Sequence, residues 1–272
     1  MRFSRGQKLA PGSNTRSLLN YSRRSMRPSV LSRGLFIGSA LFATLPLWAQ
    51  TNSQLQGDLG LAVFRTPAIT STTDRSNVVL PYVYADYGAW YGRIDTFGYK
   101  VVPVGKGYLE LAARVSLEGY RPSNPAIDKR SNPVPIGLGS FQKTPYGAFF
   151  LYGFGDPVSG GTLVDVFYAA EWGLGPLHVY PQVGFERRSA RYVQHLYGVS
   201  AAESGRSGAP IYSPSSSVTP KAAIAIDYEL MKSLKFTGEI ERKWLDKSIY
   251  DSPLVNARTQ TKGFLALTRT FQ

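Results

Sequence analysis

Two histidines are the residues of this chain best suited to act as a general acid, a general base or a nucleophile. His178 is followed by Glu186, and His195 precedes Ser200 and Glu203. A histidine combined with a carboxylate and a serine is the arrangement that hydrolases use for acyl transfer. We favour a simpler interpretation, in which His178 lies in a polar interior, His195 lies in a solvated loop, and neither is catalytic. A hydrolase is therefore a less favoured hypothesis than the two functions described below.

Other chemistry has weaker support. Two histidines without any cysteine form no cluster with metal-ligand spacing. Glu239 and Glu241 could act as a general acid and base. They alternate with Lys235 and Lys243, however, which better fits a row of opposite charges along one strand face. The glycine-rich segment 153–161 opens no helix and therefore predicts turns instead of a phosphate cradle. We expect no catalytic residue, no metal and no cofactor.

The charged residues between Lys221 and Trp244 belong to a segment in which apolar and polar side chains strictly alternate. The even positions of 222–230 are apolar, and Asp227 and Glu229 are among the odd ones; the pattern resumes at Leu234. A period of two predicts strands, because successive side chains leave a pleated backbone on opposite faces. One apolar and one ionic face suit a soluble sheet on a core, or a membrane barrel with lipid outside and a polar lumen.

The first 49 residues favour export. They carry eight basic residues and no acid, and a mostly apolar run from Leu35 to Trp48 follows. A basic leader, a short apolar run and a small residue at the cut are typical of a secretory signal peptide. We predict Sec-dependent export with cleavage after Ala49, and Met26 is an alternative start. The remaining segment, 50–272, is predicted to be a single barrel domain.

Composition excludes several classes of protein. Without the predicted leader the chain keeps 23 basic and 18 acidic residues, so the excess of positive charge is small and nucleic acid is not an expected partner. No later segment has the ~18 consecutive apolar residues of a spanning helix. Seventeen tyrosines and fourteen phenylalanines fit the aromatic girdles of an outer-membrane barrel, and also a secreted sandwich.

Ten candidate strands follow along the chain, most of them close to the ~9–11 residues of a tilted membrane strand. They lie near 57–64, 77–87, 89–99, 107–119, 144–154, 162–172, 176–190, 218–230, 233–246 and 261–271. Short turns alternate with longer polar loops. The fold class predicted is an all-β, transmembrane, antiparallel up-and-down β-barrel of ten strands, or of twelve if the proline-rich segment 120–143 contains two more. By this count, 120–143 is a periplasmic loop.

Motifs after residue 190 resemble the MipA/OmpV family of MltA-interacting outer-membrane proteins. The motifs are Tyr197-Gly198-Val199-Ser200 with Ala209-Pro210-Ile211-Tyr212, similar to the family pattern YYGV…GxPxY, and Asp251-Ser252-Pro253-Leu254-Val255, similar to DSPIV. The ending departs from the family because Gln272 follows the aromatic Phe271, and because Arg269 stands where an apolar residue is expected. An arginine near a barrel rim can extend its charge to water.

The resemblance implies that the two motif segments pack together as an extracellular cap. The candidate cap residues are Tyr197, Gly198, Tyr212, Asp251, Ser252 and Pro253. The inward parity of the strands separately predicts a polar network in the lumen. Its candidate residues are Glu110, Arg114, Asp165, Glu171, His178, Asp227, Glu239 and Glu241. Ten to twelve strands enclose a narrow space, so we expect a largely filled interior.

Two functions in the outer membrane remain in view. The resemblance implies a non-enzymatic scaffold that brings a lytic transglycosylase together with a murein (peptidoglycan) synthase, through a periplasmic surface at 120–143 or at the short turns. The alternative is a protein that binds or passes a small solute or drug, or an adhesin, using the long loops or the lumen. In both cases the lipid bilayer is a partner.

Overall fold

The computed structural model describes residues 54–72, 74 and 76–272. The predicted signal peptide and its cleavage site lie outside these residues. Within the described residues, twelve antiparallel strands form a closed ring in chain order, and a thirteenth strand, β9 (Trp172–Leu174), pairs with β10 outside the ring. The last strand pairs with the first, from Gly57 opposite Phe271 to Arg65 opposite Gly263.

The ring strands are β1 (Leu55–Arg65), β2 (Asn77–Tyr87), β3 (Trp90–Arg93), β4 (Thr96–Val104), β5 (Gly107–Arg114), β6 (Ile136–Thr144), β7 (Gly147–Asp156), β8 (Gly161–Ala170), β10 (Leu177–Arg188), β11 (Ser217–Met231), β12 (Leu234–Trp244) and β13 (Thr259–Phe271). The predicted antiparallel barrel is therefore confirmed. In the described part of the chain, no helix has the length and apolarity needed to cross a membrane.

The strand count of ten is wrong, for two local reasons. The candidate at 89–99 folds back at Ile94 and Asp95, so β3 and β4 replace one strand. Ile94 takes φ 64°, a left-handed conformation that an isoleucine side chain does not signal. The second addition is β6, which follows the prolines of 120–135. Its inward positions include Gly137 and Gly139, so the contrast between its two faces is weak in the sequence.

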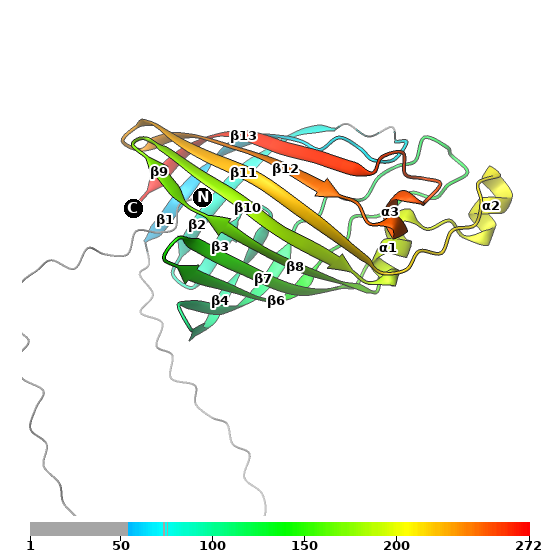
Figure 1. The fold of residues 1–272 in the computed structure, drawn as a ribbon, viewed down its shortest axis with the longest axis horizontal. Coiled ribbons are helices and arrows are strands. Elements are labelled where there is room, and N and C mark those ends of the chain that lie inside the picture. Colours follow the sequence, from blue (N-terminus) through cyan, green and yellow to red (C-terminus); the bar gives the residue numbers. More distant parts are fainter. Residues whose placement is uncertain (1–53, 73, 75) are drawn as a thin grey trace, which may run out of the picture. The chain divides into compact units, whose positions relative to one another are not determined.

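The extra strand before β5 also reverses the predicted position of the loop that follows it. Segment 115–135 lies at the end of the barrel that carries α1 (Ala190–Tyr197), α2 (Ala201–Ser207) and α3 (Lys247–Tyr250), not at the end with the short turns (Figure 1). The hydroxyl of Tyr120, for example, donates to the carbonyl of Leu196 at 2.8 Å. We call these two ends the loop end and the turn end; the C-terminus lies at the turn end (Figure 1).

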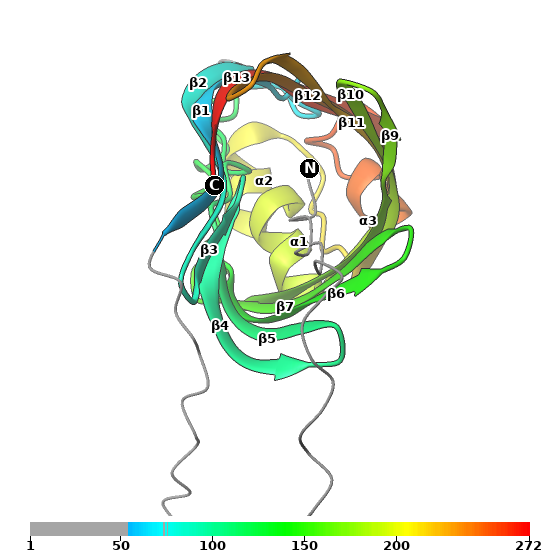
Figure 2. The ribbon, with the colours of Figure 1, turned by 90° about the vertical axis from the view of Figure 1, so that its left-hand side faces the viewer.

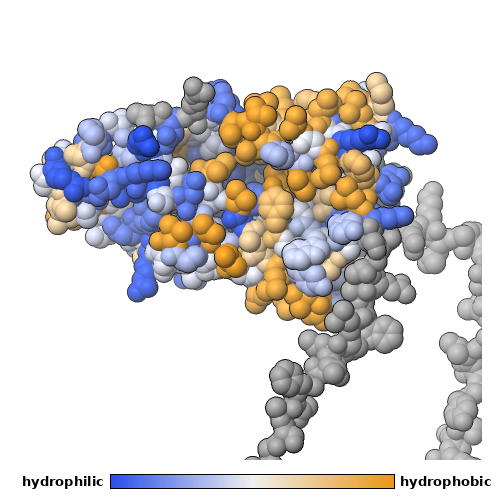
Figure 3. Space-filling view, turned by 180° about the vertical axis from the view of Figure 1, so that it is seen from behind, coloured by the Kyte–Doolittle hydropathy of each residue, from blue (hydrophilic) through white to orange (hydrophobic). Residues whose placement is uncertain are grey.

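The two faces of the wall differ as the alternation predicts. Outward side chains are apolar and open, as for Leu61 and Ile240, which are 65% and 58% exposed. Inward neighbours such as Asp58 and Glu241 are buried. Apolar residues cover much of the strand region in Figure 3, and the loop end is more polar. This parity decides which chemistry lies inside the ring.

Aromatic side chains and residues of α1 and α3 fill much of the interior. Viewed from the turn end, α1 lies across the bore, whereas α2 projects beyond the loop ends of the strands (Figures 1 and 2). One buried cluster joins α1 to β7 and includes Tyr192 and Leu196 with Phe150 and Phe154. A second cluster packs around Tyr82, Tyr180 and Phe264 on the opposite wall. Packed side chains from both clusters therefore occupy the bore.

Candidate functional sites: the lumen network and the loop-end cap

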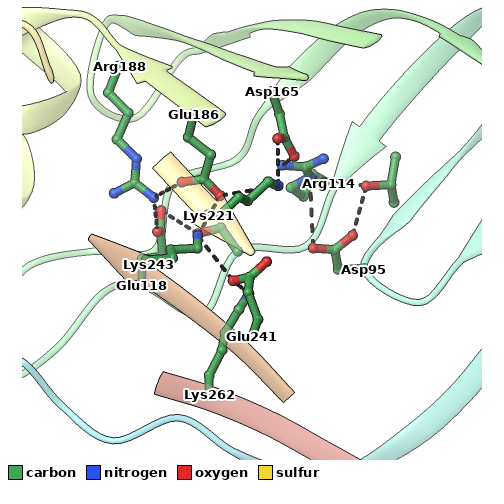
Figure 4. A network of polar contacts seen from close by, with 12 residues as sticks. Asp95, Arg114, Glu118, Asp165, Glu186, Arg188, Lys221, Glu241, Lys243 and Lys262 are labelled. Atoms are coloured by element: carbon green, nitrogen blue, oxygen red, sulfur yellow. Dashed lines mark hydrogen bonds and ion pairs between the residues drawn. The ribbon is translucent and has the colours of Figure 1, made fainter. Parts of the chain in front are cut away.

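The centre of the lumen holds a chain of ion pairs (Figure 4). Asp165 on β8 forms ion pairs with Lys221 of β11 at 2.6 Å and with Arg114 of β5 at 2.9 Å. Arg114 also donates from Nε to the hydroxyl of Thr96 at 3.0 Å and lies 5.0 Å from the ring centre of Phe154. These contacts join β5, β8 and β11, which are not neighbours in the ring, through side chains that meet in the lumen.

A second carboxylate continues the chain toward the loop end. Glu186 on β10 binds Lys243 of β12, lies 2.9 Å from Arg188 and is 3.9 Å from Lys221. Arg188 also binds Glu118 in segment 115–135. Lys221 therefore links the two buried carboxylates, and the network extends from the strands into a loop.

A third branch of the network lies along β12 and β13. Glu241 is 3.3 Å from Lys262 and 3.8 Å from Lys243. Opposite charges alternate throughout the network, which offsets the cost of removing each charge from water. A cavity lined in part by Phe167, Lys221 and Glu241 measures about 10 Å³, roughly the space of one water.

The predicted lumen residues separate into one network and four outlying sites. Arg114, Asp165 and Glu241 belong to the network. Outside it, His178 Nδ1 lies 3.8 Å from Glu171 near the turn end. Asp227 on β11 accepts a hydrogen bond from Thr237 at 2.8 Å, and Glu239 on β12 accepts one from Gln182 at 3.1 Å. Glu110 on β5 is buried, with 1% of its surface exposed.

An ion pair that the sequence did not predict lies at the closing seam of the ring. Lys235 Nζ lies 2.7 and 2.8 Å from the two carboxylate oxygens of Asp58, and Thr270 donates to the same carboxylate at 2.6 Å. Asp58 is on β1 and Lys235 on β12, with β13 between them. The parity of β1 marks Asp58 as inward, but only the closed ring shows that Lys235 is its partner.

At the loop end, the two motif segments contact each other. The hydroxyl of Ser252 donates to the carbonyl of Tyr197 at 2.6 Å, and the hydroxyl of Tyr212 donates to the carbonyl of Ser248 at 3.0 Å. A backbone bridge pairs Val199 with Tyr212. We refer to 190–213 and 247–256, together with segment 115–135, as the loop-end cap.

Individual cap candidates differ in their contacts. Gly198 accepts from Arg130 at 2.8 Å through its carbonyl, which attaches 115–135 to the cap. Asp251 is exposed and pairs with Lys247 at 2.5 Å within its own loop. Pro253 is also exposed. The interloop hydrogen bond of the DSP motif therefore comes from Ser252.

Glu203 is the most connected acid of the cap, although it is not among the candidate cap residues. It completes a capping box with Ser200 at the start of α2. It also accepts from the backbone of Asp128 at 3.1 Å and pairs with Arg130 at 2.9 Å. Burial alone would raise the pKa of Glu203, but the backbone donors of Ser200 and Asp128 and the charge of Arg130 hold it below its ordinary value.

The contacts around His195 are those of a folded loop and a helix cap, and not those of a catalytic site. His195 Nε2 lies 2.9 Å from the carbonyl of Ser131. Ser200 donates to Glu203 at 3.0 Å and accepts from its backbone at 3.2 Å, which is a helix cap. An open groove of about 400 Å³ beside α1 is lined by Ser159, Ala190, Arg191, Gln194, His195 and Pro214.

The description of the matching family model is MltA-interacting protein MipA, and the match spans residues 59–271. This range begins in β1 and ends in β13, so it covers the whole ring. The chain belongs to the MipA family. The resemblance of the 197–213 and 251–255 motifs to this family is thereby confirmed.

Curated relatives of this MipA-family chain were found at two levels of coverage. Proteins named MltA-interacting protein from Escherichia coli K12 and Shigella flexneri are each 29% identical over 132 residues, which is 48% of this chain and 53% of theirs. The chain thus spans about half the length of these relatives. A protein named "Putative outer membrane protein YiaT" from Escherichia coli O157:H7 is 22% identical over 80% of this chain and 91% of its own length.

Among solved structures, the outer membrane channel DcaP of Acinetobacter baumannii matches with a TM-score of 0.33 and 10% identity, covering 80% of this chain and 96% of that one. A similarity at this level carries no argument about the MipA-family barrel.

Proposed function

We propose that this protein is a non-enzymatic outer-membrane scaffold that holds a lytic transglycosylase, and with it a murein synthase, at the turn end of the barrel. The observation that carries the proposal is a closed wall with an apolar outer face around an interior crossed by ion pairs, in a member of the MipA family. The name MltA-interacting protein, which belongs to relatives, supplies the expected class of partner.

The outer face supports placement in a bilayer. Leu61, Val183 and Ile240, on three different ring strands, are each more than half exposed. A soluble protein rarely exposes so extended an apolar surface, whereas lipid covers such a band at no cost. The outer membrane is the bilayer in which barrels of this type are found, and the leader predicted at 1–49 is consistent with export to it.

The interior argues for a scaffold over a pore. Open aqueous channels generally need ~16–18 strands, and this ring has twelve. Asp165 on β8 holds cations from β5 and β11, and Glu186 on β10 holds cations from β11 and β12. Such a layer occupies the space that a solute would cross.

The chemistry of the histidines argues against an enzyme. His178 is paired with Glu171 at 3.8 Å, and His195 contacts a backbone carbonyl. Ser200 is the serine that the hydrolase hypothesis pairs with His195. Glu203 holds it in a capping box. The nucleophile and base of a hydrolase need to be within hydrogen-bond reach of each other.

The contact surface for the enzymes is proposed to be the turn end. Segment 120–143 is no longer a candidate, because 115–135 is part of the loop-end cap. The turns, by contrast, present large apolar side chains: Tyr146 is 77% exposed and Met231 is 69% exposed. Exposed aromatic and Met side chains are favoured anchors at protein interfaces.

A pull-down from detergent solution tests the proposal. The tagged full-length protein serves as bait, and purified lytic transglycosylase MltA and a bifunctional murein synthase serve as prey. Tyr146→Ser combined with Met231→Ser should lower the amount of captured transglycosylase by at least ~5-fold, if the two side chains are interface anchors. Ile211→Ser is the matched control, because Ile211 is 61% exposed at the loop end.

The outcome is read together with a heat-modifiability gel, in which a folded barrel migrates differently before and after boiling. If the folded wild-type protein captures no more transglycosylase than an empty resin, the scaffold is wrong. If the double variant and the Ile211→Ser control capture equal amounts to wild type, the turn end is not the contact surface.

A further inference from the structure

On the described strands, the charged side chains of the outward face are all positive. Among the outward-facing strand positions that the structure describes, four side chains are charged: Arg65, Arg187, Arg242 and Arg269. The acids of the described strands all have inward parity. A surface of mixed charge would be expected if these positions simply faced water.

Three of the four arginines lie at one level. Arg65 is the last residue of β1, Arg187 is next to last in β10, and Arg242 is two residues from the end of β12. All three ends are loop ends. The strands β10, β12 and β1 are separated from one another by β11 and β13 only. With about 4.8 Å between neighbouring strands and offsets of two and four residues along them, successive arginines are roughly 12 and 16 Å apart.

The charges of these three arginines are not neutralised by the protein. In the described part of the chain, no ion pair joins Arg65, Arg187 or Arg242 to an acid. Arg242 donates instead to the hydroxyls of Thr259 at 3.1 Å and Thr261 at 3.4 Å, which hold its guanidinium against the outer wall. Apolar side chains precede each arginine at the next outward position: Val63, Phe185 and Ile240.

We infer that Arg65, Arg187 and Arg242 form a binding surface for the phosphate groups of an acylated glycolipid in the leaflet at the loop end. The inference rests on the proposed placement of the barrel in a membrane. An arginine just above an apolar band can bury its stem against acyl chains while its guanidinium reaches the headgroup layer. The planar guanidinium binds phosphate oxygens through two parallel hydrogen bonds and remains charged at any working pH.

The fourth arginine provides an internal control. Arg269 is outward-facing on β13, two residues before the end of the strand at the turn end, and it lies 5.6 Å from the ring of Phe271. It has the same side chain and also points outward from a ring strand, at the opposite end of the barrel. It is therefore not expected to contribute to lipid binding at the loop end.

Native mass spectrometry of the detergent-purified protein tests the inference, with diphosphorylated lipid A, monophosphorylated lipid A and phosphatidylcholine as probes. Wild type should retain the diphosphorylated probe best and phosphatidylcholine least. Combining Arg65→Gln, Arg187→Gln and Arg242→Gln should weaken binding of the diphosphorylated probe by at least ~10-fold, because each arginine near a charged lipid surface contributes several-fold. Arg269→Gln should change it less than about two-fold.

Further measurements separate charge, ligand source and fold. The three lysine variants at the same positions should keep most of the binding, because the charge remains. Millimolar inorganic phosphate should not displace the lipid. Equal binding by wild type and by the triple glutamine variant, with both shifting on the unboiled gel, overturns the inference and leaves the barrel intact. Absence of a gel shift in wild type overturns the membrane placement, and the inference with it.

Discussion

The ion pair between Asp58 and Lys235 is the sharpest test of how the ring is held closed. Lys235 lies 2.7 and 2.8 Å from the two carboxylate oxygens, and the two side chains are 3% and 6% exposed. The pair spans β13 and thereby ties β12 to β1 beside the seam where the first and last strands meet. Lys235→Met removes the cation and leaves a buried carboxylate.

The expected cost follows from the burial. Removing one partner of a buried ion pair typically costs about 3–5 kcal/mol. Asp58 keeps the hydrogen bond that Thr270 donates at 2.6 Å, so we expect about 3 kcal/mol, the lower end of that range. Asp58→Asn combined with Lys235→Met leaves no buried charge, and should cost only about 1 kcal/mol. The double variant should therefore be more stable than Lys235→Met alone.

Urea unfolding in lipid vesicles, followed by tryptophan fluorescence, measures these differences. Lys232→Met is the control, because Lys232 is exposed in the turn between β11 and β12, and its change should stay within about 0.5 kcal/mol. The reasoning is refuted if Lys235→Met unfolds within about 0.5 kcal/mol of wild type, or if the double variant is as unstable as the sum of the single variants.

The remaining predictions concern the cap and the lumen. Ser252→Ala should speed hydrogen exchange in the cap by the equivalent of about 1–2 kcal/mol, because the buried carbonyl of Tyr197 loses its donor; Asp251→Ala, which breaks an exposed pair, should cost less than about 0.5 kcal/mol. The pKa of Glu203 is lowered by folding, so its stabilisation of the cap is present above the unfolded value of about 4.3 and is lost as pH falls through the folded pKa. Glu203→Gln should flatten this acid dependence in exchange measured between pH 6 and pH 3. In planar bilayers, the wild-type barrel should show no stable open steps.

Each of these expectations has an opposing result. Equal exchange in the Ser252→Ala and Asp251→Ala variants would mean that the interloop hydrogen bond does not hold the cap. An acid dependence that persists in Glu203→Gln would assign it to another group, such as Glu118, whose pKa is also lowered because the charge of Arg188 outweighs its burial. Well-resolved conductance steps would favour the solute-binding or permeability function over the scaffold.

The class of fold and the division between outside and inside can be predicted from the residues alone. The alternation from Lys221 to Trp244 was sufficient to assign the inward and outward side chains. A strand has only two faces, and here one face is apolar and the other is charged. The sequence also identified Arg114, Asp165 and Glu241 as interior charges, and the 197–213 and 251–255 motifs pointed to the family.

Tertiary structure decided the strand count, the partners and the position of segment 115–135. The turn at Ile94 and Asp95 carries no glycine or proline, so the chain reversal that yields β3 and β4 depends on pairing with neighbouring strands. Ion-pair partners such as Asp58 and Lys235 are 177 residues apart, and only ring closure brings them together. Periodicity reports which face a side chain occupies, whereas its partner across a lumen depends on where every other strand lies around the ring.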